Sequence, residues 1–187
     1  MKIGVFALQG DVREHLSLFQ ALGHAAVPVK TTPDLEAVDA LVIPGGESTT
    51  MGFLASEHGL IEPIRKRVEA GMPVFGTCAG AILLAREVRG GDVPKIGVLD
   101  IAVHRNAYGR QVDSFEQDVA VDGIGTITAV FIRAPVIDEV GEGVEVLASH
   151  DGRPAVVRQG RVLAATFHPE IAGEDRLHRF FIETVCT

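Results

Sequence analysis

Cys78 stands at a point in the sequence where a thiol could act as a nucleophile. It is the centre of a Gly-Thr-Cys-Ala-Gly segment, residues 76–80, between an apolar strand-like run at 73–76 and an apolar helix-like run at 79–85. A nucleophile on such a sharp turn needs small neighbours, and the N–H groups that begin the helix point toward a developing oxyanion. The helix N-terminus also favours the thiolate. Most free cysteines are small buried core residues, but the glycine pair in this context favours a nucleophile, whereas Cys186 has no such setting.

A thiol nucleophile usually needs an imidazole base, and His168 is the best placed histidine. It ends the apolar run 162–167 and is followed by Pro169 and Glu170. In extended backbone, residues two apart face the same way, about 6.5–7 Å apart. Glu170 can therefore orient the ring of His168, as a third group does in catalytic triads. The alternative is a loop histidine beside a surface carboxylate, which the presence of the Cys78 motif in the same chain disfavours.

The other histidines divide into three groups. Three lie in polar helical stretches, where we expect exposure to solvent: His15, His58 and His178. His24 follows a helix-ending glycine and is expected in a loop. Two lie near strand ends and stay open as alternative bases: His104 and His150.

A second glycine-containing turn, Pro-Gly-Gly-Glu-Ser-Thr-Thr at residues 44–50, follows another apolar run. Two glycines let the backbone approach a ligand closely. We expect the N–H groups of Gly46 and Ala79 to form an oxyanion hole. Residues 48–50 could instead cap the following helix, and both roles can hold together. A phosphate-binding loop is disfavoured because its Gly-Lys-Ser/Thr signature is missing.

The elements that must position these residues alternate in the first half of the chain. Strand patterns cover 3–8, 25–29, 40–43 and 73–76, and helix patterns cover 12–22, 60–70 and 79–85. This alternation predicts an α/β fold with a doubly wound, mostly parallel sheet and flanking helices.

The second half has a different pattern. Short β-like runs joined by polar or glycine turns predict antiparallel hairpins at 96–103, 115–121, 127–132, 144–148, 155–158 and 162–165. An amphipathic helix is expected at 174–185. We expect one domain, residues 1–187, whose late strands extend or flank the sheet.

The composition narrows the class of protein. The 187 residues carry a net charge of −8 with no basic run, which argues against a nucleic-acid partner because a phosphate backbone would be repelled. The two cysteines lie far apart, so we expect no disulfide and a reducing compartment. We find no signal-peptide pattern and no apolar run that approaches the roughly 18–20 residues of a membrane span. A cytoplasmic enzyme is expected, with no cofactor, because no metal-ligand spacing is present.

The motifs together resemble a known family, the triad glutamine amidotransferases, or class I glutaminases. The resemblance rests on Cys78 in its glycine-flanked turn and on His-Pro-Glu at 168–170. Four further segments resemble the glutaminase subunits of pyridoxal 5′-phosphate synthase: Ala-Leu-Gln-Gly at 7–10, the 44–50 turn, Arg-Asn-Ala-Tyr-Gly-Arg-Gln at 105–111, and Phe-Ile-Arg-Ala-Pro at 131–135. The resemblance covers essentially the whole chain and implies the flavodoxin-like class I glutaminase fold.

The resemblance also implies residue roles. Cys78, His168 and Glu170 would form the triad, and L-glutamine would be bound by Gly46, Glu47, Ser48, Arg105, Ile132 and Arg133. Without the resemblance, both arginines would be interpreted as surface salt bridges. By the same resemblance, ammonia would pass to a separate synthase subunit that makes pyridoxal 5′-phosphate from ribose 5-phosphate and glyceraldehyde 3-phosphate. Members of the family are inactive or weak alone, which implies activation by docking.

Three alternatives remain at this point. The nearest is a glutaminase that serves another synthase. A second is an α/β-hydrolase with a cysteine nucleophile, although its acid normally precedes its histidine, whereas Glu170 follows His168. The third is a non-catalytic binding module on the same fold, which an intact set of Cys78, His168 and Glu170 disfavours.

Overall fold

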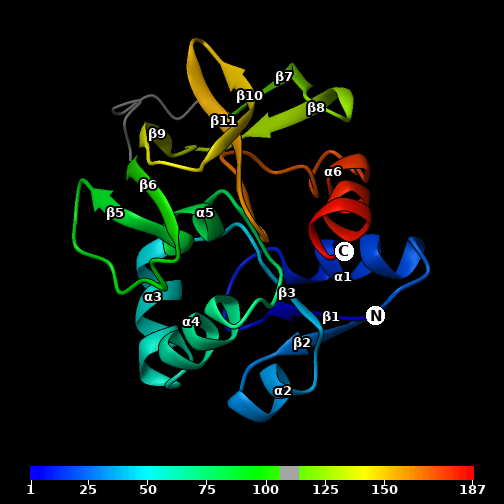
Figure 1. Ribbon diagram of the computed structural model, residues 1–187, viewed down its shortest axis with the longest axis vertical. Coiled ribbons are helices and arrows are strands. Elements are labelled where there is room, and N and C mark those ends of the chain that lie inside the picture. The colour runs from blue at the N-terminus through cyan, green and yellow to red at the C-terminus, as the bar shows by residue number, and fades with distance from the viewer. Residues whose placement is uncertain (106–113) are drawn as a thin grey trace.

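A seven-stranded sheet forms the centre of the computed structural model, which describes residues 1–105 and 114–187 (Figure 1). Its strand order is β10-β11-β12-β4-β3-β1-β2. The five parallel strands are β1 (Lys2–Phe6), β2 (Ala25–Val29), β3 (Ala40–Ile43), β4 (Val74–Thr77) and β12 (Val162–Ala165). β11 (Arg153–Gln159) is antiparallel to β12, and β10 (Glu145–His150) is antiparallel to β11. The predicted α/β fold, with a mostly parallel sheet extended by late antiparallel strands, is confirmed.

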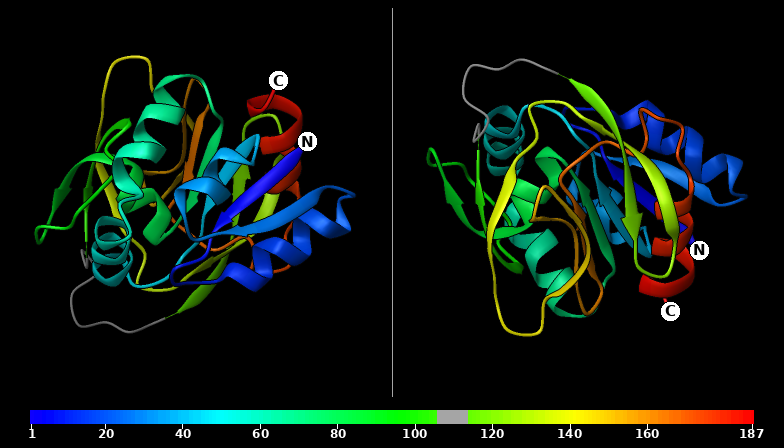
Figure 2. Two further views of the ribbon diagram at one scale, coloured as in Figure 1. Left: turned by 90° about the horizontal axis from the view of Figure 1, so that it is seen from below. Right: turned by 90° about the horizontal axis from the view of Figure 1, so that it is seen from above.

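Helices cover both faces of this sheet (Figures 1 and 2). One face carries α2 (Thr32–Glu36), α3 (Ser48–Glu57), α4 (Ile61–Glu69) and α5 (Ala79–Leu84), and the other carries α1 (Val12–Ala21) and α6 (Arg176–Phe180), which continues as the π-helical turn η1 (Phe181–Val185). The central strands are buried on both faces, so their sequences are continuous apolar runs. In β3, Leu41 and Ile43 join one core, and Val42 joins the other. Side chains alternate between the faces of a strand, so one short run serves two cores.

Two smaller sheets flank the central one. β5 (Ala85–Arg89), β6 (Leu99–His104) and β9 (Val136–Val140) form a three-stranded sheet, and β7 (Phe115–Val121) pairs with β8 (Gly125–Phe131) as a hairpin. β5 runs parallel to β6, an arrangement that the expected hairpins did not include. The helix expected to reach residue 85 ends at Leu84, and the chain continues directly as β5.

The predicted amphipathic pattern of the last helix is confirmed, but the helix ends in a π-helical turn and is not a regular α-helix throughout. Leu177, Phe181 and Val185 are buried in the core beneath it. His178 is also fully buried there, so its predicted exposure is wrong. Figure 2 shows the two chain ends beside each other at this side of the molecule. Within the described residues, we find no helix with the length and apolar character that a bilayer span requires.

Candidate active site

Cys78 occupies the strained turn that its sequence motif predicts. It lies between β4 and α5 with φ 46° and ψ −102°, and its side chain is nearly buried. A positive φ in a residue other than glycine is a strained conformation that costs on the order of 1–3 kcal/mol and is concentrated at functional sites. The N–H of Cys78 donates to the carbonyl of Ala165 in β12, at 2.8 Å, which anchors the turn. A methyl group at Gly80 would collide with the carbonyl oxygen of Ile43, so the small residue is required for α5 to approach β3.

The ring of His168 is held between two carboxylates. Its Nδ1 lies 2.9 Å from Oε1 of Glu170 and 3.2 Å from Oδ2 of Asp11. The expectation that His168 and Glu170 face the same way is confirmed. Burial disfavours the charged ring, but hydrogen bonds to Asp11, Cys78 and Glu170 outweigh burial and raise the pKa of His168 to about 12. These groups therefore favour the imidazolium form of His168.

Glu170 lies behind His168 in the protein interior, with its side chain fully buried. Oε1 of Glu170 also accepts a hydrogen bond from the hydroxyl of Thr77, at 3.3 Å, and lies 3.6 Å from Nε2 of His15. Burial disfavours the ionised carboxylate, but the charge and hydrogen bonds of His15, followed by those of His168, outweigh it. The pKa of Glu170 is therefore held below its usual value, and Glu170 stays ionised.

A cavity of about 340 Å³ opens in front of Cys78 and His168. It is lined by Gln9, Asp11, Gly46, Glu47, Ser48, Cys78, Ala79, Ile82, Arg105, Ile132, Arg133, Pro135, His168 and Ile171. Every residue that the sequence predicts for the site therefore borders one cavity, except Glu170, which contacts it through His168. Sγ of Cys78 lies 3.9 Å from the carbonyl oxygen of Ile132, which places the turn after β8 directly over the thiol.

The turn at residues 44–50 forms one wall of the cavity. The cap of α3 is Glu47 and not residues 48–50, because its carboxylate accepts the N–H groups of Thr49 and Thr50 at 3.1 and 2.8 Å. Burial works against ionisation, but hydrogen bonds from Thr50 and then Thr49 outweigh it and lower the pKa of Glu47 to about 2. Ala79 is the first residue of α5, so its N–H has no partner within the helix, and the residue borders the cavity. Gly46 borders the same cavity.

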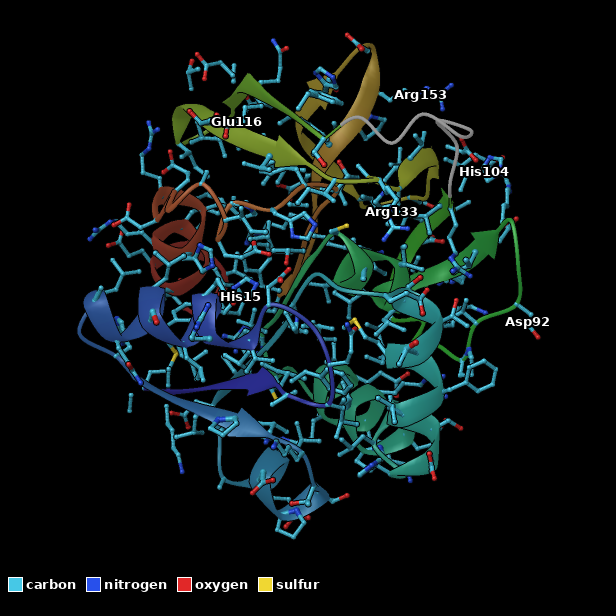
Figure 3. All side chains as sticks on the ribbon, turned by 180° about the vertical axis from the view of Figure 1, so that it is seen from behind. His15, Asp92, His104, Glu116, Arg133 and Arg153 are labelled. Carbon is cyan, nitrogen blue, oxygen red and sulfur yellow. The ribbon has the colours of Figure 1, made fainter. Side chains whose placement is uncertain are left out.

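The two arginines of the cavity have different surroundings. Arg105 donates to the hydroxyl of Thr49 at 2.6 Å and lies 3.5 Å from the carboxylate of Glu47. Arg133 has φ 43°, a second strained residue at the cavity, and no carboxylate of the described residues lies within 4.0 Å of its guanidinium. Arg133 is exposed to solvent and lies in the upper half of the view in Figure 3. The rest of the segment that begins at Arg105, residues 106–111, lies outside the described residues.

The two alternative bases lie away from the cavity. His104 pairs with Asp138 at 3.9 Å and stands at the edge of the molecule (Figure 3), and the ring of His150 stacks on Phe131. Neither residue is among those that line the cavity with Cys78. His168 is thus the histidine that the fold brings to the thiol.

The sequence interpretation missed Asp11 and misjudged His15. Asp11 begins α1, yet its side chain turns toward His168 instead of capping the helix. Its place in the loop that follows β1 was an available signal, because ligands bind at the carboxyl ends of parallel strands. His15 is fully buried, so its predicted exposure is wrong. Its polar neighbours in the sequence concealed the one face of α1 that packs inward.

Among the described residues, one group of side chains lies close enough together to ligate a metal ion. Asp11, His168 and Glu170 bring one ligand atom each within 4.8 Å of one another. The hydrogen bonds of His168 Nδ1 to the two carboxylates account for this grouping. The arrangement is the one that a base and its orienting acids require.

Comparison with known proteins assigns the chain to a family. The SNO glutamine amidotransferase family matches residues 5–187. The chain belongs to this family. A pyridoxal 5′-phosphate synthase subunit PdxT from Thermus thermophilus is 57% identical over 183 residues, which cover 97% of this chain and 96% of the relative. PdxT from Pelotomaculum thermopropionicum is 55% identical over 185 residues, which cover 98% and 94% of the two chains.

Comparison with solved structures supports the same family. A crystal structure described as a glutamine amidotransferase is 53% identical, covers 99% of both chains and superposes with a TM-score of 0.94. The predicted class I glutaminase fold and the predicted enzyme class are confirmed, and the α/β-hydrolase alternative is excluded by the family membership.

Proposed function

We propose that this protein hydrolyses L-glutamine to L-glutamate and ammonia through Cys78, His168 and Glu170, and passes the ammonia to a synthase subunit that makes pyridoxal 5′-phosphate. The observation that carries the proposal is the single cavity that joins the strained thiol of Cys78, the ring of His168 and the guanidinium of Arg133. Relatives more than half identical to the chain along nearly its whole length are pyridoxal 5′-phosphate synthase subunits, which supports this product.

The reaction begins with an ion pair. The raised pKa of His168 favours a resting imidazolium beside the thiolate of Cys78. The thiolate attacks the carboxamide carbon of glutamine, and the carbonyl oxygen becomes an oxyanion. The N–H groups of Gly46 and Ala79 stabilise that oxyanion, as preorganised donors do in acyl transfer. Ionised Glu170 holds the ring of His168 in place during the attack.

Collapse of the tetrahedral intermediate breaks the carbon–nitrogen bond. The imidazolium of His168 gives its proton to the leaving nitrogen, so ammonia departs and a glutamyl thioester remains on Cys78. Neutral His168 then takes a proton from water, and the resulting hydroxide attacks the thioester carbon. The carbon–sulfur bond breaks, glutamate leaves, and the thiolate–imidazolium pair is restored.

Charged groups around the cavity orient the amino-acid end of glutamine. Arg133 is the best candidate for the α-carboxylate, because a planar guanidinium makes two charge-assisted bonds to a carboxylate. Arg105, whose position is set by Thr49 and Glu47, supplies further N–H donors. Glu47, Ser48 and the Ile132 carbonyl border the same space and complete the proposed binding site.

Docking of the synthase subunit is proposed to control the reaction, because an uncoupled glutaminase wastes glutamine. The turn at Gly45 and Gly46 is the proposed control element. A methyl group at Gly45 would overlap the ring of His168, so this turn and the base are in close contact. A small reorientation of the turn would therefore change the oxyanion donor at Gly46 together with the surroundings of His168.

The test measures glutamate release by the isolated chain and by its mixture with the synthase subunit, followed by glutamine-dependent formation of pyridoxal 5′-phosphate. We expect little release by the chain alone, a clear increase with the synthase, and product formation from glutamine. Absence of glutamine hydrolysis in both samples would refute the proposed chemistry. A rate that the synthase does not change would refute the control by docking, and activation by another synthase only would refute the product.

A further inference from the structure

Further buried polar groups contact Glu170 on the side away from the cavity. Nε2 of His15 lies 3.6 Å from Oε1 of Glu170 and 3.2 Å from the hydroxyl oxygen of Thr77, and Nδ1 of His15 lies 2.9 Å from Nε2 of His178. His15, Thr77 and His178 are fully buried. They come from α1, the end of β4 and α6, three elements that are distant in the sequence. Figure 3 shows His15 on α1, on the side of the molecule where α6 packs.

The protons of this group can be assigned by counting donors. The hydroxyl of Thr77 has one proton, which it donates to Oε1 of Glu170 at 3.3 Å. Thr77 can then only accept from His15, so Nε2 of His15 must carry a proton. This holds whether His15 is neutral or charged, because the charged ring carries a proton on both nitrogens. His15 therefore presents an N–H to Thr77 and Glu170 in either form.

His178 fixes the ring of His15 from the other side. It packs among Phe19 and Phe75, with ring centroids 5.1 and 5.6 Å away and edge-to-face geometry. Burial in this apolar pocket, with the neighbouring charge of His15, lowers the pKa of His178 to about 3, so the ring stays neutral. A neutral ring can hold His15 by one hydrogen bond without adding a second charge to the interior.

Glu170 depends on these donors more than an exposed carboxylate would. Within the described residues, its second oxygen, Oε2, is buried and has no hydrogen-bond partner. All the support that the described residues give its charge therefore reaches Oε1, from His168, Thr77 and His15. Removal of a donor to a buried ionised group costs more than the loss of an ordinary hydrogen bond.

We infer that His15, together with Thr77 and His178, is a positioning residue of the glutaminase reaction, which keeps Glu170 ionised and its Oε1 aimed at His168. This inference rests on the proposed function. His15 does not line the cavity, so it acts on the rate of the chemical steps and not on the binding of glutamine.

The test compares variants in the complex with the synthase subunit, with glutamate release followed from acidic to alkaline pH. His15→Leu removes the N–H, and His15→Gln keeps an amide N–H near the position of Nε2. We expect His15→Leu to lower kcat roughly tenfold, because it removes the N–H that Thr77 accepts and that lies 3.6 Å from the carboxylate of Glu170. KM for glutamine should change little, and His15→Gln should recover most of the rate.

The pH profile separates positioning from simple loss of packing. Without the His15 donor, the pKa of Glu170 rises, so the acidic limb of kcat/KM should move to higher pH in His15→Leu. Asp11, Thr77 and Cys78 also face His168 or Glu170, and they are unchanged in that variant. The matched control is Phe19→Leu, which loosens packing against His178 but leaves every hydrogen bond of the group; its acidic limb should stay in place while its melting temperature falls.

A second variant covers the case in which His15→Leu does not fold. Thr77→Val removes only the hydroxyl that donates to Glu170, and we expect the same lower kcat and the same shift of the acidic limb. Unchanged kcat and an unchanged pH profile in the folded variants would overturn the positioning role and leave the proposed function intact. Wild-type complex without glutaminase activity would instead refute the proposed function itself.

Discussion

Replacement of Glu170 by glutamine should slow glutamine hydrolysis without abolishing it. Oε1 of Glu170 lies 2.9 Å from Nδ1 of His168, and a charge-assisted hydrogen bond of this kind contributes about 1.5–3 kcal/mol. At about 1.4 kcal/mol per factor of ten, its loss predicts a kcat roughly ten- to a hundredfold lower. The upper part of this range is not expected, because Oδ2 of Asp11 lies 3.2 Å from the same nitrogen and remains as a second acceptor.

Asp11 and Glu170 share the same nitrogen of His168 as hydrogen-bond partner, so their substitutions should be coupled. Asp11→Asn alone should cost less than about tenfold in kcat, since the fully buried Glu170 still holds His168 and Asp11 is partly exposed. The double variant, Glu170→Gln with Asp11→Asn, should lose more than the product of the two single effects. Neighbours that share one partner are expected to couple in this way.

The assay is glutamate release at saturating glutamine, with the synthase subunit present, over a range of pH. Both carboxylates raise the pKa of His168, so each substitution should lower that pKa, and the double variant should lower it most. Wild-type turnover after Glu170→Gln, whether Asp11 is kept or replaced by asparagine, would refute the role assigned to this carboxylate. A double variant that shows only the product of the single effects would refute the shared support of His168.

Three further predictions follow from the burial of particular groups. Gly80→Ala should destabilise the protein by about 1–3 kcal/mol in chemical unfolding, the usual cost of overpacking, because its methyl group meets the carbonyl of Ile43; an unchanged midpoint would contradict this contact. A glutamine-analogue electrophile should label Cys78 and spare Cys186, since burial raises the pKa of the Cys186 thiol to about 12, and peptide mapping that finds equal labelling would be contrary to the site. His178 has a pKa of about 3 against its ordinary 6.5, so the unfolded chain binds a proton between these values that the folded chain does not. Stability should therefore fall as pH falls from 6.5 toward 3, and less steeply in His178→Gln when urea unfolding is measured across that range; equal slopes would contradict the burial of a neutral ring.

The parallel part of the fold could be predicted because its signals are local. The apolar runs at Ala25–Val29 and Ala40–Ile43 became β2 and β3 with the expected bounds. The glycines around Cys78 indicate a sharp strand-to-helix turn from residues 76–80 alone, and the contact of Gly80 with Ile43 of β3 is what the small residue then permits. The spacing of His168 and Glu170 likewise needs only the two-residue period of extended backbone. Local pattern was enough for each of these features.

The features that were not predicted depend on contacts between elements that are distant in the sequence. β5 follows α5 without a break, and its parallel pairing with β6 leaves no local signal. His15 and His178 have polar neighbours in their own helices, and their burial follows from the packing of α1 against α6. Asp11 reaches His168 because β1 and β12 end at the same edge of the sheet. The sequence of each segment taken alone does not indicate these contacts between distant elements.

The most direct test of the account is the nitrogen source of the complex formed by Cys78→Ala with the synthase subunit. Formation of pyridoxal 5′-phosphate should be lost with glutamine as the nitrogen donor and retained with added ammonium salt, while glutamine still binds to the variant. Normal product formation from glutamine by Cys78→Ala would contradict the assignment of Cys78 as the nucleophile.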